Sequence, residues 1–200
     1  MIKSLSDKIT SFLVCNNSID NEESEVCSYG LEVLISSLIN LVIILLIGAI
    51  LGKLMQTVVF VACYCSIRQF SGGYHASSHG KCIFTFLCMY IVTVLIVGNI
   101  YSIHLKPVVL FIGILSWISI FILVPVEHIN NPLSDLEKIK NRKNARVIAT
   151  LVLVGILLGL SLDSVYEYVI YSVLAIFWVN VMFILQIVKN KGEVKDEEIF

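Results

Sequence analysis

Charged side chains are scarce in this sequence of 200 residues. Asp, Glu, Lys and Arg together make up 14% of the chain, well below the roughly 25% that is usual in soluble domains. The formal net charge is only −1, so the charge balance gives no basis for binding a nucleic acid. The composition therefore excludes an ordinary soluble domain and argues against a nucleic-acid partner.

Several other sequence signals are missing. The six cysteines include no Cys-x-x-Cys pair, so neither a disulfide framework nor a cysteine-based metal site is expected. The first thirty residues lack a compact apolar core followed by small residues at a cleavage site, so we predict no cleavable signal peptide. The short alternating segments of a β-barrel are also missing.

Long apolar runs are what the chain has in abundance. Hydrophobic residues make up 58% of it, the mean hydropathy is +0.90, and runs near twenty residues long can each cross a ~30 Å hydrocarbon core. The sequence therefore predicts an all-α, polytopic integral membrane protein that forms a single domain over residues 1–200. We expect about six transmembrane helices, at 31–52, 54–70, 82–100, 107–126, 146–162 and 167–188.

Two of the apolar segments leave alternatives open. The run 54–67 is short, so it crosses the membrane only if it extends to Phe70, and otherwise forms a re-entrant or tilted segment. We favour a span. Residues 1–14 have apolar side chains at helical spacing with charges between them, which indicates an amphipathic helix. It either lies in the membrane interface or packs on the protein's own core.

Charges outside the runs predict the orientation. Positive residues favour the cytoplasmic side. The stretch 136–146, interpreted as a loop, carries five cations, and the C-terminal tail adds three, whereas the turn at 163–167 is acidic. Both termini and the polar stretch 68–82 are therefore predicted to be cytoplasmic. The cations at 138–146 either set the topology alone or also bind an acidic peptide precursor or anionic lipid.

One polar, glycine-rich stretch interrupts the first half of the chain: Arg68-Gln-Phe-Ser-Gly-Gly-Tyr-His-Ala-Ser-Ser-His-Gly-Lys-Cys82. A cysteine nucleophile needs a base to form thiolate, and a cation or helix N-terminus to stabilise it. On one straight helix His75 and Cys82 would lie about 10 Å apart, too far for direct proton transfer. If the two residues work together, the segment must fold back between them, which its glycines allow, and Cys82 would then lie in the first turn of the next helix.

The pattern Arg68-x-x-x-Gly72-Gly73-x-His75-Ala76-x-x-x-x-x-Cys82 resembles the signature of the accessory gene regulator B (AgrB) family. Members are bacterial membrane cysteine endopeptidases that process quorum-sensing peptide precursors. The run Pro125-Val-Glu-His-Ile-Asn-Asn-Pro132-Leu also resembles a family element. The resemblance extends over roughly residues 30–188, and the histidine and cysteine motif is its most specific part.

The resemblance implies a mechanism and partners. In the family, the cysteine attacks a peptide carbonyl of the precursor (AgrD) while the histidine acts as general base, which assigns these roles to Cys82 and His75. A thiol of the precursor then attacks the acyl-enzyme thioester and closes a thiolactone ring. The expected partners are an AgrD-like precursor, the lipid bilayer and a second copy of the chain in a homodimer. No cofactor is expected.

Further residues have candidate supporting roles. Arg68 and Lys81 either anchor the segment at the interface, or have a functional role, which is to lower the pKa of the thiol or to bind an acidic substrate tail. Backbone N–H groups near Gly72 and Gly73, or at the start of the following span, are candidates for holding the oxyanion. A third member of the catalytic set stays open among Glu32, Glu127 and Ser78. Glu32 stands at the start of the first predicted span, which also carries Asn40.

Two rival interpretations have weaker support. His79 follows His75 by four residues, but no glutamate follows the first histidine as in zinc proteases, so no metal site is expected. A small-peptide transporter or exporter subunit without protease activity is the alternative function. Permeation paths usually need ionisable residues, and the predicted spans carry almost none away from their ends. A purely structural subunit would leave the glycine-rich stretch unexplained.

Overall fold

The computed structural model describes residues 2–16, 18–20, 23–72, 79–100, 105–126 and 134–197. Within these residues the chain is helical, and its only β pairing is an isolated bridge between Gly72 and Val126. The all-α prediction is confirmed. The elements are α1 (Ile2–Cys15), α2 (Ser24–Ile50), α3 (Leu54–Ser71), α4 (His79–Ile100), α5 (Lys106–Leu123), α6 (Asp135–Gly159), the short η3 (Asp163–Val165) and α7 (Tyr166–Glu197).

Among the described helices, four are long and apolar enough to cross a membrane: α2, α4, α5 and the stretch 163–190 that contains most of α7. The chain is therefore an integral membrane protein by the length and composition of these helices. Helices α3 and α6 do not meet the same criterion, so six spans remain a prediction.

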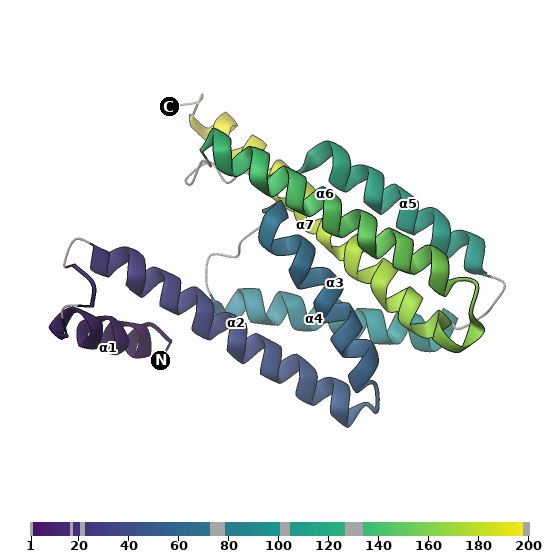
Figure 1. The fold of residues 1–200 in the computed structure, drawn as a ribbon, viewed down its shortest axis with the longest axis horizontal. Coiled ribbons are helices and arrows are strands. Elements are labelled where there is room, and N and C mark those ends of the chain that lie inside the picture. The colour runs from purple at the N-terminus through teal and green to yellow at the C-terminus, as the bar shows by residue number, and fades with distance from the viewer. Residues whose placement is uncertain are drawn as a thin grey trace.

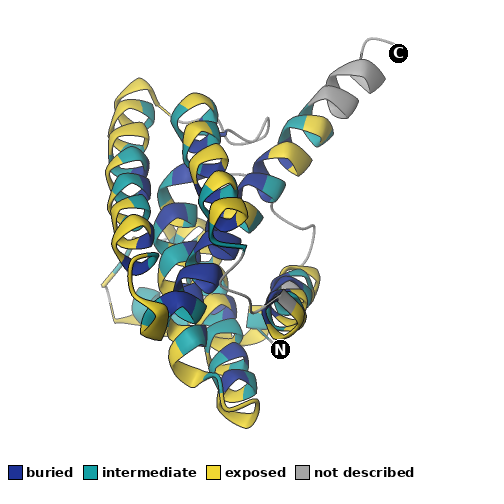
Figure 2. Cartoon of the chain, turned by 90° about the vertical axis from the view of Figure 1, so that its right-hand side faces the viewer, coloured by how far each residue is buried: buried dark blue, intermediate teal, exposed yellow. Residues whose placement is uncertain are grey.

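Helix α7 lies at the centre of the bundle. It contacts α3, α4, α5 and α6, and α5, α6 and α7 run side by side (Figure 1). In the most apolar stretch of α7, 56% of the residues are buried inside the protein. The corresponding shares are 17% in α2, 28% in α4 and 22% in α5. Figure 2 shows buried residues where the helices meet and exposed residues along their outer sides. The outer helices thus present apolar side chains to lipid, while α7 packs against protein.

Helix α1 packs beside the N-terminal half of α2, away from the α5–α7 layer (Figure 1). The Ser28 hydroxyl donates to the Asp7 carboxylate at 2.9 Å, and the Ser6 hydroxyl donates to the Ser28 carbonyl. Helix α1 therefore contacts α2, and its position in the membrane interface stays a prediction. Helix α2 begins at Ser24, so Glu32 lies two turns inside the helix and not at its start.

The interpretation of 136–146 as a loop was wrong, because these residues form the first three turns of α6. The helix starts at a capping box. The Ser134 hydroxyl accepts from the Glu137 N–H, and the Glu137 carboxylate accepts from the Ser134 N–H at 3.0 Å. A capping box satisfies N–H groups that a helix start leaves free, so this sequence begins a helix before the apolar run. The basic side chains therefore extend from a helix.

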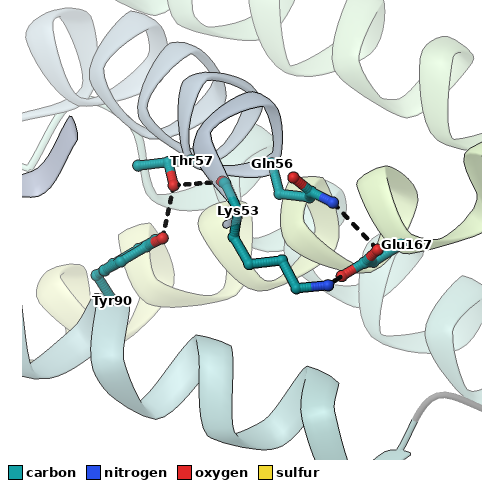
Figure 3. A network of polar contacts seen from close by, with 5 residues as sticks. All are labelled: Lys53, Gln56, Thr57, Tyr90 and Glu167. Carbon is teal, nitrogen blue, oxygen red and sulfur yellow. Dashed lines mark hydrogen bonds and ion pairs between the residues drawn. The ribbon is translucent and has the colours of Figure 1, made fainter. Parts of the chain in front are cut away.

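The end of the bundle at the α2–α3 turn is held by polar contacts between helices (Figure 3). Lys53 forms an ion pair with Glu167 of α7 at 2.6 Å, and Gln56 donates to the same carboxylate. The Tyr90 hydroxyl of α4 lies against that of Thr57, which donates to the Lys53 carbonyl. The start of α3 is thereby fixed to α4 and α7.

Candidate active site

Cys82 lies in the first turn of α4, as predicted, and its side chain is exposed. It lines a cavity of about 210 Å³ between α2, α3, α4 and α7. The walls are mostly apolar, and Arg68 of α3 is among the residues that form them. The other lining residues are Ser37, Asn40, Leu41, Val61, Tyr64, Cys65, Thr85, Phe86, Met89 and Met182.

Aromatic packing between α3 and α4 brings Arg68 and Cys82 to this cavity. The rings of Tyr64 and Phe86 have their centroids 4.8 Å apart. Arg68 follows Tyr64 by one helical turn, and Cys82 precedes Phe86 by one turn, so each shares a helix face with one of the two rings. Arg68 is also hydrogen-bonded to Tyr64. The ring contact therefore sets a cation and a thiol at the mouth of one cavity.

This placement is suited to thiolate chemistry. Backbone N–H groups in the first turn of a helix and a nearby guanidinium both favour an anion. A group of three or more His, Cys, Asp or Glu side chains that could hold a metal does not occur among the described residues. The described part of the cavity thus has an exposed thiol at a helix start next to a mostly apolar space.

The ends of α3 and α5 meet beside this site. The Val126 N–H donates to the Ser71 carbonyl at 2.9 Å, and Gly72 pairs with Val126 in a parallel bridge. Gly72 has φ +69°, and a Cβ built on it would lie 2.2 Å from the Val126 carbonyl oxygen. Only glycine fits this backbone conformation and close approach. The bridge joins the glycine-rich stretch to the 125–132 run, two motifs that are far apart in the sequence.

Two arginines of α6 fix the end of α5 next to the bridge. Arg142 donates from Nε to the Val124 carbonyl at 3.2 Å, and Arg146 donates from Nη2 to the Phe121 carbonyl at 2.6 Å. The Arg146 guanidinium also lies over the Phe121 ring, 5.1 Å from its centroid. The last carbonyls of a helix lack intrahelical donors, and these side chains supply them. The charged start of α6 therefore holds the segment that leads into the bridge.

Of the other predicted site residues, one lies next to Cys82, one lines a different cavity, and the rest lie outside the described residues. Lys81 is exposed and adjacent to Cys82 in the first turn of α4. Glu32 lines a different cavity of about 730 Å³ between α1 and α2, which does not include Cys82. The remaining candidates lie outside the described residues: Gly73, His75, Ser78 and Glu127.

Sequence reasoning missed the contribution of α2 to the cavity. Ser37 and Asn40 line it with Cys82, although only Glu32 was singled out in this segment. The available signal was an asparagine in the middle of an apolar run. Polar side chains inside membrane helices are costly and mostly face protein or a cavity, but the sequence does not tell which face of α2 meets the cysteine.

The fold and the cavity together define a helical membrane protein with a thiol site at one end of its bundle. The chain belongs to the accessory gene regulator B (AgrB) family, whose model matches residues 6–187. It is 26% identical to an AgrB-like protein of Clostridium perfringens strain SM101 over 148 residues, 72% of this chain and 69% of the relative. It is 30% identical to an AgrB-like protein of Listeria innocua over 156 residues, 77% of this chain and 76% of the relative. No solved structure is significantly similar.

Family membership connects the chain with quorum-sensing peptide processing, with an AgrD-like precursor and with a membrane location. The resemblance inferred from the histidine and cysteine motif is thus confirmed at the level of the family. It does not by itself assign the reaction or the residues that perform it.

Proposed function

We propose that the protein is a membrane cysteine endopeptidase that cleaves the C-terminal part of an AgrD-like precursor. Cys82 is the nucleophile and His75 its general base. The cleaved acyl group is held as a thioester on Cys82 until a thiol or hydroxyl of the precursor attacks it. That attack closes a thiolactone or lactone ring and frees the enzyme.

The position of Cys82 carries the proposal. It is an exposed thiol in the first turn of a helix, at a mostly apolar cavity that Arg68 also lines. Cys63 and Cys88 do not line this cavity. Cys65 lines it as well, but it lies within the body of α3 and not at the start of a helix. Cys82 therefore has the surroundings of a reactive cysteine, with a helix N-terminus and a cation to favour the thiolate.

The apolar walls of the cavity support ring closure over hydrolysis. Exchange of one thioester for another is nearly neutral in energy, so the acyl group stays activated as it moves to the precursor. Water would compete for the same acyl group. A site that excludes water limits this side reaction, and a cavity lined by Leu41, Val61 and Met89 offers water few partners.

The supporting residues have distinct proposed roles. Arg68 and Lys81 stabilise the thiolate or bind an acidic part of the substrate. Gly72 fixes the path of the catalytic segment through its bridge, and backbone N–H groups near Gly72 and Gly73 contribute to oxyanion binding. Glu32, which lines the cavity between α1 and α2, takes part only if the precursor extends from Cys82 to that cavity.

We further propose six spans, with both termini and the site on the cytoplasmic side. Lys53 and Lys106, at the other end of the bundle, are paired with Glu167 and Asp163, each at 2.6 Å. These acids offset the lysines there, so the excess of positive charge lies at the Cys82 end, where α6 begins. Excess positive charge marks the cytoplasmic side, where a newly made precursor would meet the site. A homodimer is a further proposal from the family.

Mass spectrometry of the purified protein tests the reaction. The protein in detergent is incubated with synthetic AgrD-like precursors, as wild type, Cys82→Ala and His75→Ala. We expect a covalent adduct on the wild type, no adduct on Cys82→Ala and slow adduct formation on His75→Ala. Cys88→Ala, on the same helix but away from the cavity, is the matched control and should behave as the wild type.

The same experiment separates the rival function. A transporter or exporter subunit without protease activity should tolerate Cys82→Ala and form no adduct. Cleavage that persists in Cys82→Ala would contradict the proposed mechanism. An adduct located on Cys65 instead of Cys82 would show that Cys82 is not the nucleophile.

A further inference from the structure

Asn40 stands out among the residues that line the Cys82 cavity. It lies in the middle of α2, within an apolar stretch of a membrane helix, and it faces the same space as the thiol. Its carboxamide makes no hydrogen bond in the described structure. A polar side chain at this depth normally has a partner, because water is absent from the hydrocarbon region.

The Ser37 and Thr85 hydroxyls that line the cavity are already bonded to their own helix backbones. Around the cavity, the Ser37 hydroxyl donates to the Val33 carbonyl at 2.7 Å, and the Thr85 hydroxyl donates to the Lys81 carbonyl at 2.8 Å. Elsewhere, the Asn99 carboxamide donates to the carbonyl one turn earlier at 2.7 Å. Asn40 therefore differs from Ser37 and Thr85 in keeping its side-chain donors available at the cavity.

We propose that Asn40 is a catalytic residue that donates its Nδ2–H to the carbonyl oxygen of the scissile peptide bond. This inference rests on the proposed function, since it concerns the same reaction at Cys82. Asn40 would be the side-chain component of the oxyanion site, reaching the reacting carbonyl from α2 while the thiol approaches from α4.

The donation matters most when charge develops on the oxygen. The Cys82 thiolate forms a bond to the carbonyl carbon, and the π electrons of the C=O bond move to the oxygen. The Asn40 N–H donates a hydrogen bond to the resulting oxyanion. Collapse restores the C=O bond and breaks the C–N bond, and the amine leaves with the proton carried by the general acid. A fixed donor in a mostly apolar cavity stabilises this charge more than one in water does.

Two substitutions test the role. Asn40→Leu removes the carboxamide with an apolar side chain of similar size, and Asn40→Asp keeps the shape but replaces the donor with an acceptor. For each variant we would measure the single-turnover rate of acyl-enzyme formation with a precursor that the wild type cleaves. We expect both rates to fall by about 10²–10³-fold, as for the loss of one oxyanion donor.

A second readout separates this role from a structural one. Alkylation of Cys82 by iodoacetamide, followed by peptide mass spectrometry, needs the thiolate but no oxyanion donor. Its rate should be unchanged in Asn40→Leu. The matched control is Asn99→Leu, which replaces an asparagine in a membrane helix whose donor is already used by the backbone, and which should leave both rates at the wild-type level.

Three results would overturn the proposal in distinguishable ways. Acyl-enzyme formation at the wild-type rate in Asn40→Leu would exclude a catalytic role for Asn40 and leave the proposed function intact. An equal loss of alkylation and acylation would make Asn40 a structural residue. A wild-type protein that forms no acyl-enzyme with any precursor would reject the proposed function, and the role of Asn40 with it.

Discussion

The two ends of the bundle use polar side chains in opposite ways. At the end near the α2–α3 turn, lysines meet carboxylates and hydroxyls meet one another, as in the Lys53–Glu167 and Thr57–Tyr90 contacts (Figure 3). At the end where α4 begins, an exposed thiol and an amide with unused donors line a cavity. At the first end, the lysines, carboxylates and hydroxyls of Figure 3 bind one another, whereas the second end has groups on a cavity that a ligand could reach.

The comparison shows how to separate structure from function in a chain with few polar residues. A polar group in a membrane helix is costly unless it has a partner. Where the partner is in the same chain, the group explains stability. Where the described structure offers none and a cavity is present, the group is a candidate for substrate contact. Asn40 meets the second condition, and Gln56, which donates to Glu167, meets the first.

Among substitutions outside the proposed catalytic residues, the largest effect is expected from replacing the glycine of the interhelical bridge. Gly72→Ala places a Cβ 2.2 Å from the Val126 carbonyl oxygen at a positive φ, so the ends of α3 and α5 must separate. Because misplacement of catalytic groups by about 1 Å can cost about 10²-fold in rate, we expect a loss of that size in precursor cleavage, measured per folded molecule.

Gly52→Ala is the control at the other end of the bundle. Gly52 has nearly the same φ, +66°, but nothing lies within 4 Å of a Cβ built there. The substitution should cost about 1–2 kcal/mol of stability from backbone strain alone and leave cleavage unchanged. Equal losses of cleavage in the two variants would mean that the contact with Val126 has no role in positioning the site.

An intermediate effect is expected from breaking the Lys53–Glu167 ion pair near the α2–α3 turn. Glu167→Gln removes the carboxylate that Lys53 and Gln56 share. The pair is partly exposed, so we expect a loss of about 1 kcal/mol in the free energy of unfolding, measured by thermal unfolding in detergent. Cleavage per folded molecule should not change. Asp163→Asn, whose carboxylate is more exposed, should cost less, and a fall in cleavage in either variant would couple the two ends.

The smallest effect is expected at the start of α6. Hydrogen bonds from the Ser134 hydroxyl and N–H to the Glu137 carboxylate hold the pKa of Glu137 below its ordinary value. A lowered pKa stabilises the folded state fully above the ordinary glutamate pKa, and this contribution disappears as the pH falls through the lowered pKa. Stability at the start of α6 should therefore decrease on acidification.

Ser134→Ala tests this expectation. It should lower the free energy of unfolding at neutral pH by about 1 kcal/mol, the usual effect of losing a serine cap. The deficit relative to wild type should shrink at acidic pH, where the wild type also loses its bonds to the ionised carboxylate. A deficit that is constant with pH would show that the carboxylate does not contribute.

The histidine and cysteine motif and the apolar runs were readable in the sequence because both are local. Cys82 in the first turn of its helix and the limits of α3, 54–71 against the predicted 54–70, agree with the structure. The start of α6 was misplaced because hydropathy marks the membrane part of a helix and not its capped beginning. Ser134 with Glu137 was the signal that could have corrected it.

The sequence by itself determined that this chain is a helical membrane protein of the AgrB family, because hydropathy, positive charge and motif spacing are properties of single segments. Only the tertiary structure decided which segments share a site. It joined Gly72 to Val126, put Asn40 of α2 and Cys82 of α4 on the same cavity, and placed Glu32 at another cavity. The reason is physical: helix faces meet through packing of side chains over their whole length, and no local pattern specifies which face of α2 meets α4.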